Sequence, residues 1–167
     1  MLSEKLQQAL NDQLNYEFSS AYTYLSMAAY FEDLDLNGFA HWMKIQYQEE
    51  LMHAERVYAF INDRDGRVRL QAIAEPHSEW DSPLDAFKFA LEGERALSKR
   101  IYAVVNEALA EGDHATHTFM QWFVNEQVEE EAIVRNIVSD MELIIESRDG
   151  LFLMDRDLAG RRPQGEE

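Results

Sequence analysis

The sequence predicts an all-α fold, a four-helix bundle with one long crossover connection and a short fifth helix at the C-terminal end. Apolar residues recur at alternating spacings of three and four along four long stretches, which is the pattern of helices that share a core. Only 3 Pro and 7 Gly interrupt the chain, and they gather between those stretches. No region of the sequence is rich in strand patterns. The 167 residues suit a single domain spanning 1–167.

The first two helices are expected at residues 3–34 and 37–62. Ser3 can cap the first helix, because its hydroxyl can accept a hydrogen bond from an unpaired amide of the first turn. The sequence "DLNG" (35–38) supplies turn-forming residues between the two helices. Since so short a connection leaves no room for a crossover, the two helices are predicted to run antiparallel.

A long irregular segment, residues 63–82, follows the second helix. That helix is on the order of 40 Å long at ~1.5 Å per residue, and an extended chain at up to ~3.3 Å per residue can run back along it. Within the segment, "RVRLQAI" (67–73) alternates polar and apolar residues, which is typical of an extended strip lying on a surface. The segment therefore predicts a crossover that leaves the second and third helices parallel.

The remaining helices are expected at residues 83–111, 115–147 and 151–159. Ser82 can cap the third helix, and Pro83 suits its first turn. The sequence "EGDH" (111–114) separates the third helix from the fourth. After Gly150, "LFLMDRDLA" is expected to form the short fifth helix, and "GRRPQGEE" (160–167) a frayed tail.

The composition excludes several classes of site and partner. With 0 Cys, the chain has no disulfide, thiolate metal site, iron–sulfur cluster or cysteine nucleophile. The 32 acidic residues outnumber 15 basic ones and give a net charge of −17, which repels nucleic acid and anionic membranes and attracts cations. The sequence has no signal-peptide core, and no apolar run approaches membrane length. We therefore expect a cytoplasmic protein with no nucleic-acid or membrane partner.

Each of the four long helices interrupts its apolar spacing with a glutamate near its middle. These residues are Glu17, Glu50, Glu94 and Glu130. No Lys or Arg lies at the core-facing positions. Burying the four carboxylates together without cations would be prohibitive, because each unpaired carboxylate costs several kcal/mol. Metal ions are the compensation that remains.

A histidine joins these carboxylates. His53 lies three residues after Glu50, so both side chains project from one side of the helix towards one metal. Four carboxylates and one imidazole exceed the needs of a single ion, which predicts more than one metal. Oxygen-rich ligation with one histidine suits iron or manganese better than a closed zinc site.

The sequences "EELMH" (49–53) and "NEQVEEE" (125–131), taken with Glu17 and Glu94, resemble the ferroxidase centre of prokaryotic non-haem ferritins. These proteins belong to the ferritin-like di-iron carboxylate family. The resemblance covers essentially the whole chain, from the four long helices and the single long crossover to the short C-terminal helix.

The resemblance implies a role for each of the central residues. It implies that Glu17, Glu50 and His53 bind the first iron. It further implies that Glu50 bridges to a second iron, which is held by Glu94 with Glu130 nearby.

The same resemblance extends to residues around the two irons. It implies that Gln127 lies beside the second iron or next to the place where oxygen binds, and that Tyr24 lies beside the centre. The adjacent acids Glu49, Glu126 and Glu129 resemble a third iron site on the side that faces the cavity. Taken alone, "VEEEA" is typical of a solvated helix face, and its pairing with Glu49 favours the metal interpretation.

Differences from related families narrow the expected cofactors. Bacterioferritins and rubrerythrins repeat the Glu-x-x-His pair on the fourth helix, and this chain has no histidine there. The haem-ligating Met of bacterioferritins aligns with Leu51, whereas Met52 lies about 100° round the helix, so no haem is expected. The iron that rubrerythrins hold with cysteine cannot form in a chain with 0 Cys. The expected cofactor is iron, with two ions at the ferroxidase centre and a third site.

The predicted function is iron storage and detoxification. The chain would act as a ferroxidase that takes Fe(II) and dioxygen as substrates and deposits a ferric mineral inside a protein cage. The resemblance implies a homo-oligomer of 24 subunits. An alternative from another class is a di-iron or di-manganese redox enzyme, oxidase-like or peroxidase-like, that stores no mineral. A third is a plain structural bundle without metal chemistry. Particle mass and retained iron separate storage from the redox enzyme. Stoichiometric binding of Fe(II) without air, followed by rapid oxidation when air is added, would exclude the plain bundle.

Overall fold

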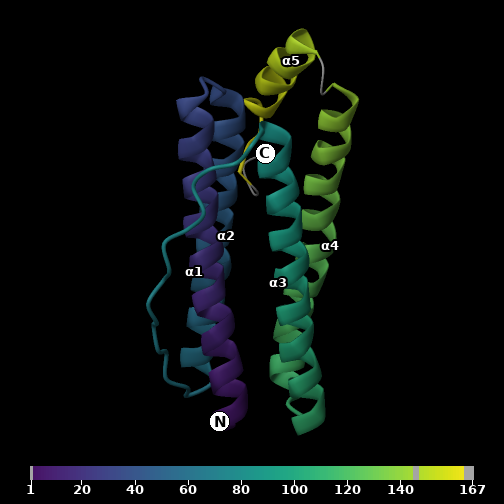
Figure 1. The fold of residues 1–167 in the computed structure, drawn as a ribbon. Coiled ribbons are helices and arrows are strands. Elements are labelled where there is room, and N and C mark those ends of the chain that lie inside the picture. The colour runs from purple at the N-terminus through teal and green to yellow at the C-terminus, as the bar shows by residue number, and fades with distance from the viewer. Residues whose placement is uncertain (1, 145–146, 164–167) are drawn as a thin grey trace.

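The long helices pack side by side, and a short helix lies across one end of the bundle (Figure 1). The computed structural model describes residues 2–144 and 147–163. The helices, in chain order, are α1 (Glu4–Asp33), α2 (Asn37–Asp63), α3 (Pro83–Glu111), α4 (His114–Leu143) and α5 (Arg148–Leu158). The predicted all-α fold is confirmed, with its single long crossover and short fifth helix.

The connection from Arg64 to Ser82 runs the length of the bundle beside α1, so that α2 and α3 point in the same direction (Figure 1). Side-chain amides of α1 hold it there. Asn11 accepts from the backbone N–H of Arg69 (2.6 Å) and donates to the carbonyl of Arg67 (3.0 Å). Asn15, one turn later, accepts from the N–H of Gln71 (2.8 Å). Amides four residues apart on a helix rise about 6 Å, which nearly matches two residues of an extended chain.

The junction of α4 and α5 differs from the expected boundaries. α4 ends at Leu143 rather than at residue 147, and residues 145–146 lie outside the described part of the chain. α5 begins at Arg148, because the hydroxyl of Ser147 caps it by accepting from the N–H of Gly150 (2.9 Å). Gly150 is therefore inside the first turn of α5 and does not precede it. A Cβ there would lie 2.8 Å from the Cβ of Ile144, so this close approach requires glycine.

The predicted tail over 160–167 falls only partly within the described residues. Residues 160–163 carry no helix, and residues 164–167 lie outside the described part. Arg161, near the start of this tail, is half-buried.

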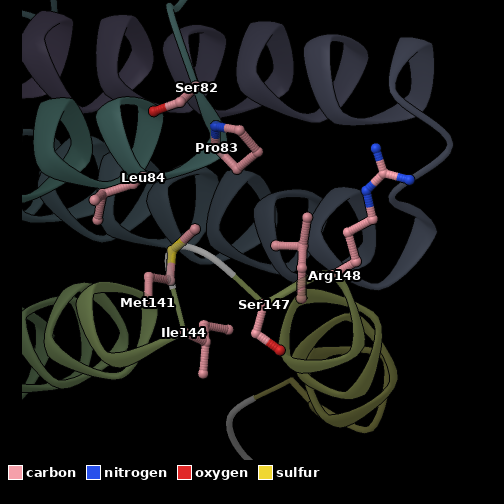
Figure 2. Close-up of a pocket in the computed structure, with 8 residues that line it drawn as sticks. Ser82, Pro83, Leu84, Met141, Ile144, Ser147 and Arg148 are labelled. Carbon is pink, nitrogen blue, oxygen red and sulfur yellow. The ribbon is translucent and has the colours of Figure 1, made fainter.

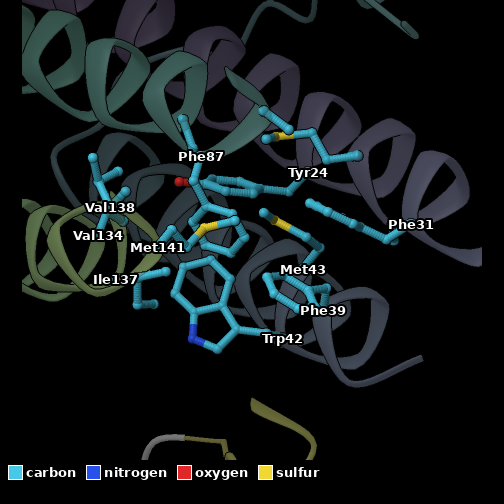
Figure 3. Close-up of a cluster of buried hydrophobic side chains, with 14 of the residues drawn as sticks. Tyr24, Phe31, Phe39, Trp42, Met43, Phe87, Val134, Ile137, Val138 and Met141 are labelled. Atoms are coloured by element: carbon cyan, nitrogen blue, oxygen red, sulfur yellow. The ribbon is translucent and has the colours of Figure 1, made fainter. Parts of the chain in front are cut away.

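Two apolar clusters fill the bundle on either side of its middle. Figure 3 shows the cluster nearer α5, where aromatic rings and methionines converge. Its largest members include Phe31, Phe39, Trp42, Met43 and Phe87. The other cluster includes Leu10, Leu14, Val57, Ile101 and Phe123. On each long helix, the central glutamate lies between the residues of one cluster and those of the other. These glutamates are Glu17, Glu50, Glu94 and Glu130. Within residues 2–144 and 147–163, no helix is long and apolar enough to cross a membrane.

A pocket of about 390 Å³ opens where the start of α3, the end of α4 and the start of α5 meet (Figure 2). Its walls include Leu84, Met141, Ile144 and Leu151, and none of the described residues that line it is acidic. The pocket is therefore separate from the polar middle of the bundle, where the candidate site lies.

Candidate metal centre

One glutamate from each long helix is buried in the middle of the bundle. Glu17 and Glu50 are 0% exposed, and Glu94 and Glu130 are 1% exposed. Each occupies a core-facing position because the helical repeat of 3.6 residues carries the apolar stripe through it. Carboxylates this deeply buried need compensating charge or hydrogen-bond donors.

Glu17, Glu50 and His53 form the tightest group. Each offers one ligand atom, and these atoms all lie within 4.8 Å of one another. Nδ1 of His53 is 3.5 Å from Oε2 of Glu50, one turn earlier on the same helix. The imidazole packs edge-on against Trp122, with 5.4 Å between ring centroids. The ring is thereby held in place beside the two carboxylates.

Glu94 is held by hydrogen bonds from two neighbouring helices. The hydroxyl of Tyr24 on α1 donates to Oε1 of Glu94. Nε2 of Gln127 on α4 donates to Oε2 of Glu94 (3.0 Å) and to its backbone carbonyl (3.2 Å). Tyr24 and Gln127, both assigned to this centre by resemblance, therefore orient the carboxylate of α3.

Two glutamines that sequence reasoning gave no role also hold the centre. Nε2 of Gln13 donates to Oε1 of Glu17 (2.7 Å), and Nε2 of Gln46 donates to Oε2 of Glu130 (3.0 Å). Gln13 lies one helical turn before Glu17, a spacing that could have indicated the contact. Gln46 reaches Glu130 on another helix, and only its core-facing position gave a signal.

Several carboxylate oxygens at the centre are buried and accept no hydrogen bond. They are Oε2 of Glu17, both oxygens of Glu50 and Oε1 of Glu130. Buried carboxylate oxygens left without a hydrogen bond, beside an imidazole whose Nδ1 lies 3.5 Å from one of them, match the ligands of iron or manganese. The group of Glu17, Glu50 and His53 therefore fits such a metal.

The electrostatics of the centre agree with this fit. Burial raises the pKa of Glu17 well above its usual range, and the nearby Glu50 raises it further. Burial also raises the pKa of Glu50 well above its usual range, with Glu94 adding to the effect. For Glu130, burial and then Glu94 raise the pKa to about 7. Burial raises the pKa of Glu94 too, but hydrogen bonds from Tyr24 and Gln127 oppose it.

The three acids of the expected third site have different surroundings. Glu49 is 1% exposed, and its Oε2 accepts from the Arg161 guanidinium at 2.6 Å. Glu126 is 9% exposed, and Glu129 is exposed. Among the described residues, these three do not form a group whose ligand atoms meet closely enough for one metal. Sequence reasoning missed Arg161, because no local pattern relates it to Glu49.

A small pocket of about 130 Å³ between α1 and α3 reaches the centre from outside the bundle. Its lining includes Ser20, Thr23 and Gly93, and it ends at Tyr24 and Glu94. Hydroxyl groups in this lining suit water and small polar solutes.

Comparisons with known proteins point to one family. A family model described as "Ferritin-like domain" matches residues 7–144. A bacterial non-heme ferritin of Bacteroides fragilis (strain 638R) is 43% identical over 161 residues, which cover 96% of this chain and 100% of the relative. A bacterial non-heme ferritin of Staphylococcus aureus (strain MRSA252) is 36% identical over 161 residues, which cover 96% of this chain and 97% of that relative. An open-pore ferritin of the archaeon Archaeoglobus fulgidus has a similar structure, with a TM-score of 0.96, 50% identity and coverage of 97% and 99%.

Proposed function

Because this chain belongs to the ferritin-like family, we propose that it stores iron, oxidising Fe(II) at a paired site inside the bundle and depositing ferric mineral inside a protein cage. The similarity to bacterial non-heme ferritins extends over nearly the full length of the chain, which supports the whole function rather than the fold alone. The observation that carries the proposal is the buried group of Glu17, Glu50 and His53.

We assign the ligands by what surrounds each carboxylate. Glu17, Glu50 and His53 would hold the first iron, since their ligand atoms already converge. Glu50 has two oxygens that accept no hydrogen bond, so it can bridge to a second iron. Glu94 and Glu130 would complete the second site, with Gln127 beside them.

The neighbouring polar residues would keep these ligands in position. Tyr24 and Gln127 fix the carboxylate of Glu94, and Gln13 and Gln46 fix those of Glu17 and Glu130. Raised pKa values mean that the site without metal retains protons, so Fe(II) binding releases them. Carboxylates stabilise Fe(III) over Fe(II), which favours transfer of electrons to dioxygen.

We further propose that the chains assemble into a 24-subunit shell and that Glu49, Glu126 and Glu129 contribute a third iron site. The named similarity to ferritins supports assembly into a homo-oligomer. The net charge of −17 would favour accumulation of Fe(II) by the assembled particle.

Native mass measurement combined with metal analysis tests the proposal. The purified protein should form a particle of 24 chains of 19.5 kDa that retains far more iron than two ions per chain after aerobic loading and desalting. A small oligomer that turns over oxygen but retains only its site metals would instead indicate a non-storing redox enzyme. No Fe(II) oxidation above the rate in buffer would exclude both.

A further inference from the structure

Arg161 comes after α5 and Gly160, and its side chain reaches back into the bundle. The guanidinium of Arg161 donates to Oε2 of Glu49 (2.6 Å) and to Oε1 of Gln46. It lies over the ring of Trp42, 4.3 Å from the centroid, and its backbone carbonyl pairs with the ring Nε2 of His41 (2.9 Å). The side chain is 15% exposed and that of Glu49 only 2%. This is a built site for the guanidinium, since hydrogen bonds and a ring face both receive it.

The segment that carries Arg161 is fastened to α2 at a second place. Oδ1 of Asp155 on α5 accepts from the N–H of Gly38 (2.8 Å) and of Phe39 (3.1 Å). It thereby caps the start of α2, where Leu36 supplies no side-chain cap. Only glycine fits at position 38, because a Cβ there would collide with the carbonyl oxygen of Asp155. The position of α5 therefore determines where Arg161 enters.

Arg161 is linked to the metal centre as well as to Glu49. Gln46 accepts from Arg161 and donates to Oε2 of Glu130 (3.0 Å). A single amide thus separates the guanidinium from a carboxylate of the second iron site. Glu49, the other acceptor of the guanidinium, is one of the three acids of the expected third site.

We propose that Arg161 pairs with Glu49 until a third metal ion displaces it, so that loading of the third site frees Arg161 and the segment 160–163 from the bundle. The inference rests on the proposed function, because it concerns the third iron site of that function. A divalent ion bound to Glu49 would lie within a few ångströms of the guanidinium, and like charges that close repel strongly where water is scarce. Metal and guanidinium therefore exclude each other at this carboxylate.

Calorimetric titration with Fe(II) in the absence of air measures the competition between the third metal ion and Arg161 for Glu49. Arg161→Gln should leave the first two equivalents per chain unchanged and tighten the third by about tenfold, because the metal no longer displaces a charge-assisted pair. Arg161→Lys should give an intermediate affinity, since an ammonium lacks the planar fork. Arg162→Gln is the matched control: it removes the same charge from an exposed neighbour and should match the unaltered protein.

Chemical modification of arginine gives a readout that does not depend on oxidation. Phenylglyoxal is small enough to diffuse where proteases cannot reach, and peptide mass mapping locates its adducts. In the metal-free protein, Arg161 should react at least about tenfold more slowly than Arg162, because it is paired and stacked. Adding Fe(II) anaerobically beyond two equivalents per chain should bring the Arg161 rate close to that of Arg162.

Two results would overturn the proposal: a third equivalent that binds Arg161→Gln no more tightly than the unaltered protein, or an Arg161 that stays protected while that equivalent is bound. Failure of the proposed function has a different signature, because the first two equivalents would then also bind weakly. Loss of the oligomer in Arg161→Gln would make Arg161→Lys and the modification rates of the unaltered protein the deciding measurements.

Discussion

Asp113 and Glu130 are both carboxylates of the α4 region, and their pKa values move in opposite directions. Asp113 accepts two hydrogen bonds from the Arg64 guanidinium (3.0 and 2.9 Å) and one from the N–H of Thr116 (2.9 Å). These donors, Arg64 first, lower its pKa to about 2. Glu130 is more deeply buried and receives one donor, from Gln46, and burial raises its pKa to about 7.

The difference shows two ways of accommodating an acid in a helical bundle. At the α3–α4 turn the chain supplies its own cation, and the carboxylate stabilises the fold by capping α4 and pairing with α2. In the middle of the bundle the chain leaves oxygens of Glu17, Glu50 and Glu130 without donors. That arrangement costs stability in the metal-free protein and leaves ligand atoms ready for metal, the trade expected of a functional site.

The strongest test separates the two regions by function. Replacing both Glu50 and His53 with Ala should slow the initial oxidation of Fe(II) by at least about a hundredfold, since the proposed site would lose two of its ligands. The Asp113→Ala protein should oxidise Fe(II) within about twofold of the unaltered rate. Stopped-flow absorbance of ferric species measures both. An unchanged rate in the first protein, or loss of the oligomer, contradicts the ligand assignment.

The next effect concerns stability at the α3–α4 turn. Asp113→Ala should lower the free energy of unfolding by about 2–3 kcal/mol, because it removes an N-cap and leaves the partly buried Arg64 without its partner. Thermal melting at fixed protein concentration measures the change. Glu129→Ala, at an exposed position of the same helix, is the control and should stay within about 0.5 kcal/mol. A similar small change at Asp113 would mean that water replaces the pair without loss.

Removing a carboxylate charge from the candidate metal centre should stabilise the metal-free protein, the opposite of the effect at Asp113. The folded pKa of Glu50 is raised, so its protonated form favours folding at low pH, and that contribution is lost as pH rises through the raised value. Glu50→Gln should therefore raise the free energy of unfolding of the metal-free protein at pH 7 by about 1–2 kcal/mol. The gain should shrink as pH falls towards 4.5, the ordinary pKa of a glutamate.

Glu94→Gln should give a smaller gain than Glu50→Gln, because Glu94 already accepts hydrogen bonds from Tyr24 and Gln127. Melting of the chelated proteins from pH 5 to 8 compares the two. A Glu50→Gln protein that melts below the unaltered one at pH 7 would mean that the centre is already well paired without metal.

The smallest expected effect is the loss of the stabilising contribution of Asp113 at low pH. Its folded pKa is lowered from 3.8 to about 2, so its contribution is present above 3.8 and is lost as pH falls towards 2. The destabilisation caused by Asp113→Asn should therefore shrink by about 1 kcal/mol between pH 5 and pH 2.5, a figure reduced for solvent screening. Chemical denaturation at the two pH values measures it. If Asp113→Asn destabilises the protein equally at both pH values, the shape of the side chain and not its charge is responsible.

Periodicity predicted the buried glutamates because it is a local property of a helix. Residues three or four apart lie on one side, so the stripe that contains Leu14 also contains Glu17, and the stripe that contains Val57 also contains His53. Lengths and breakers likewise predicted a crossover that runs the length of the bundle, whereas its place beside α1 emerged only from the structure. The assignment of individual irons to these residues stays a prediction.

The start of α5 shows where local signals were insufficient. A glycine favours helix ends, so Gly150 indicated a boundary. The structure has it within the first turn, because Ser147 caps the helix and Ile144 leaves no room for a larger side chain. The close approach involves the end of α4, and turn residues alone do not report it.

By itself, the sequence determined the all-α class, the number of helices and the glutamate that each long helix turns inwards near its middle, since all of these follow from spacing along one chain segment. Only the tertiary structure decided that Asp155 caps α2 and that Arg161 pairs with Glu49, residues 112 positions apart. Such contacts depend on how α5 packs across the end of the bundle. No periodicity links the partners, and the free energy that joins them is realised only after the four long helices have packed.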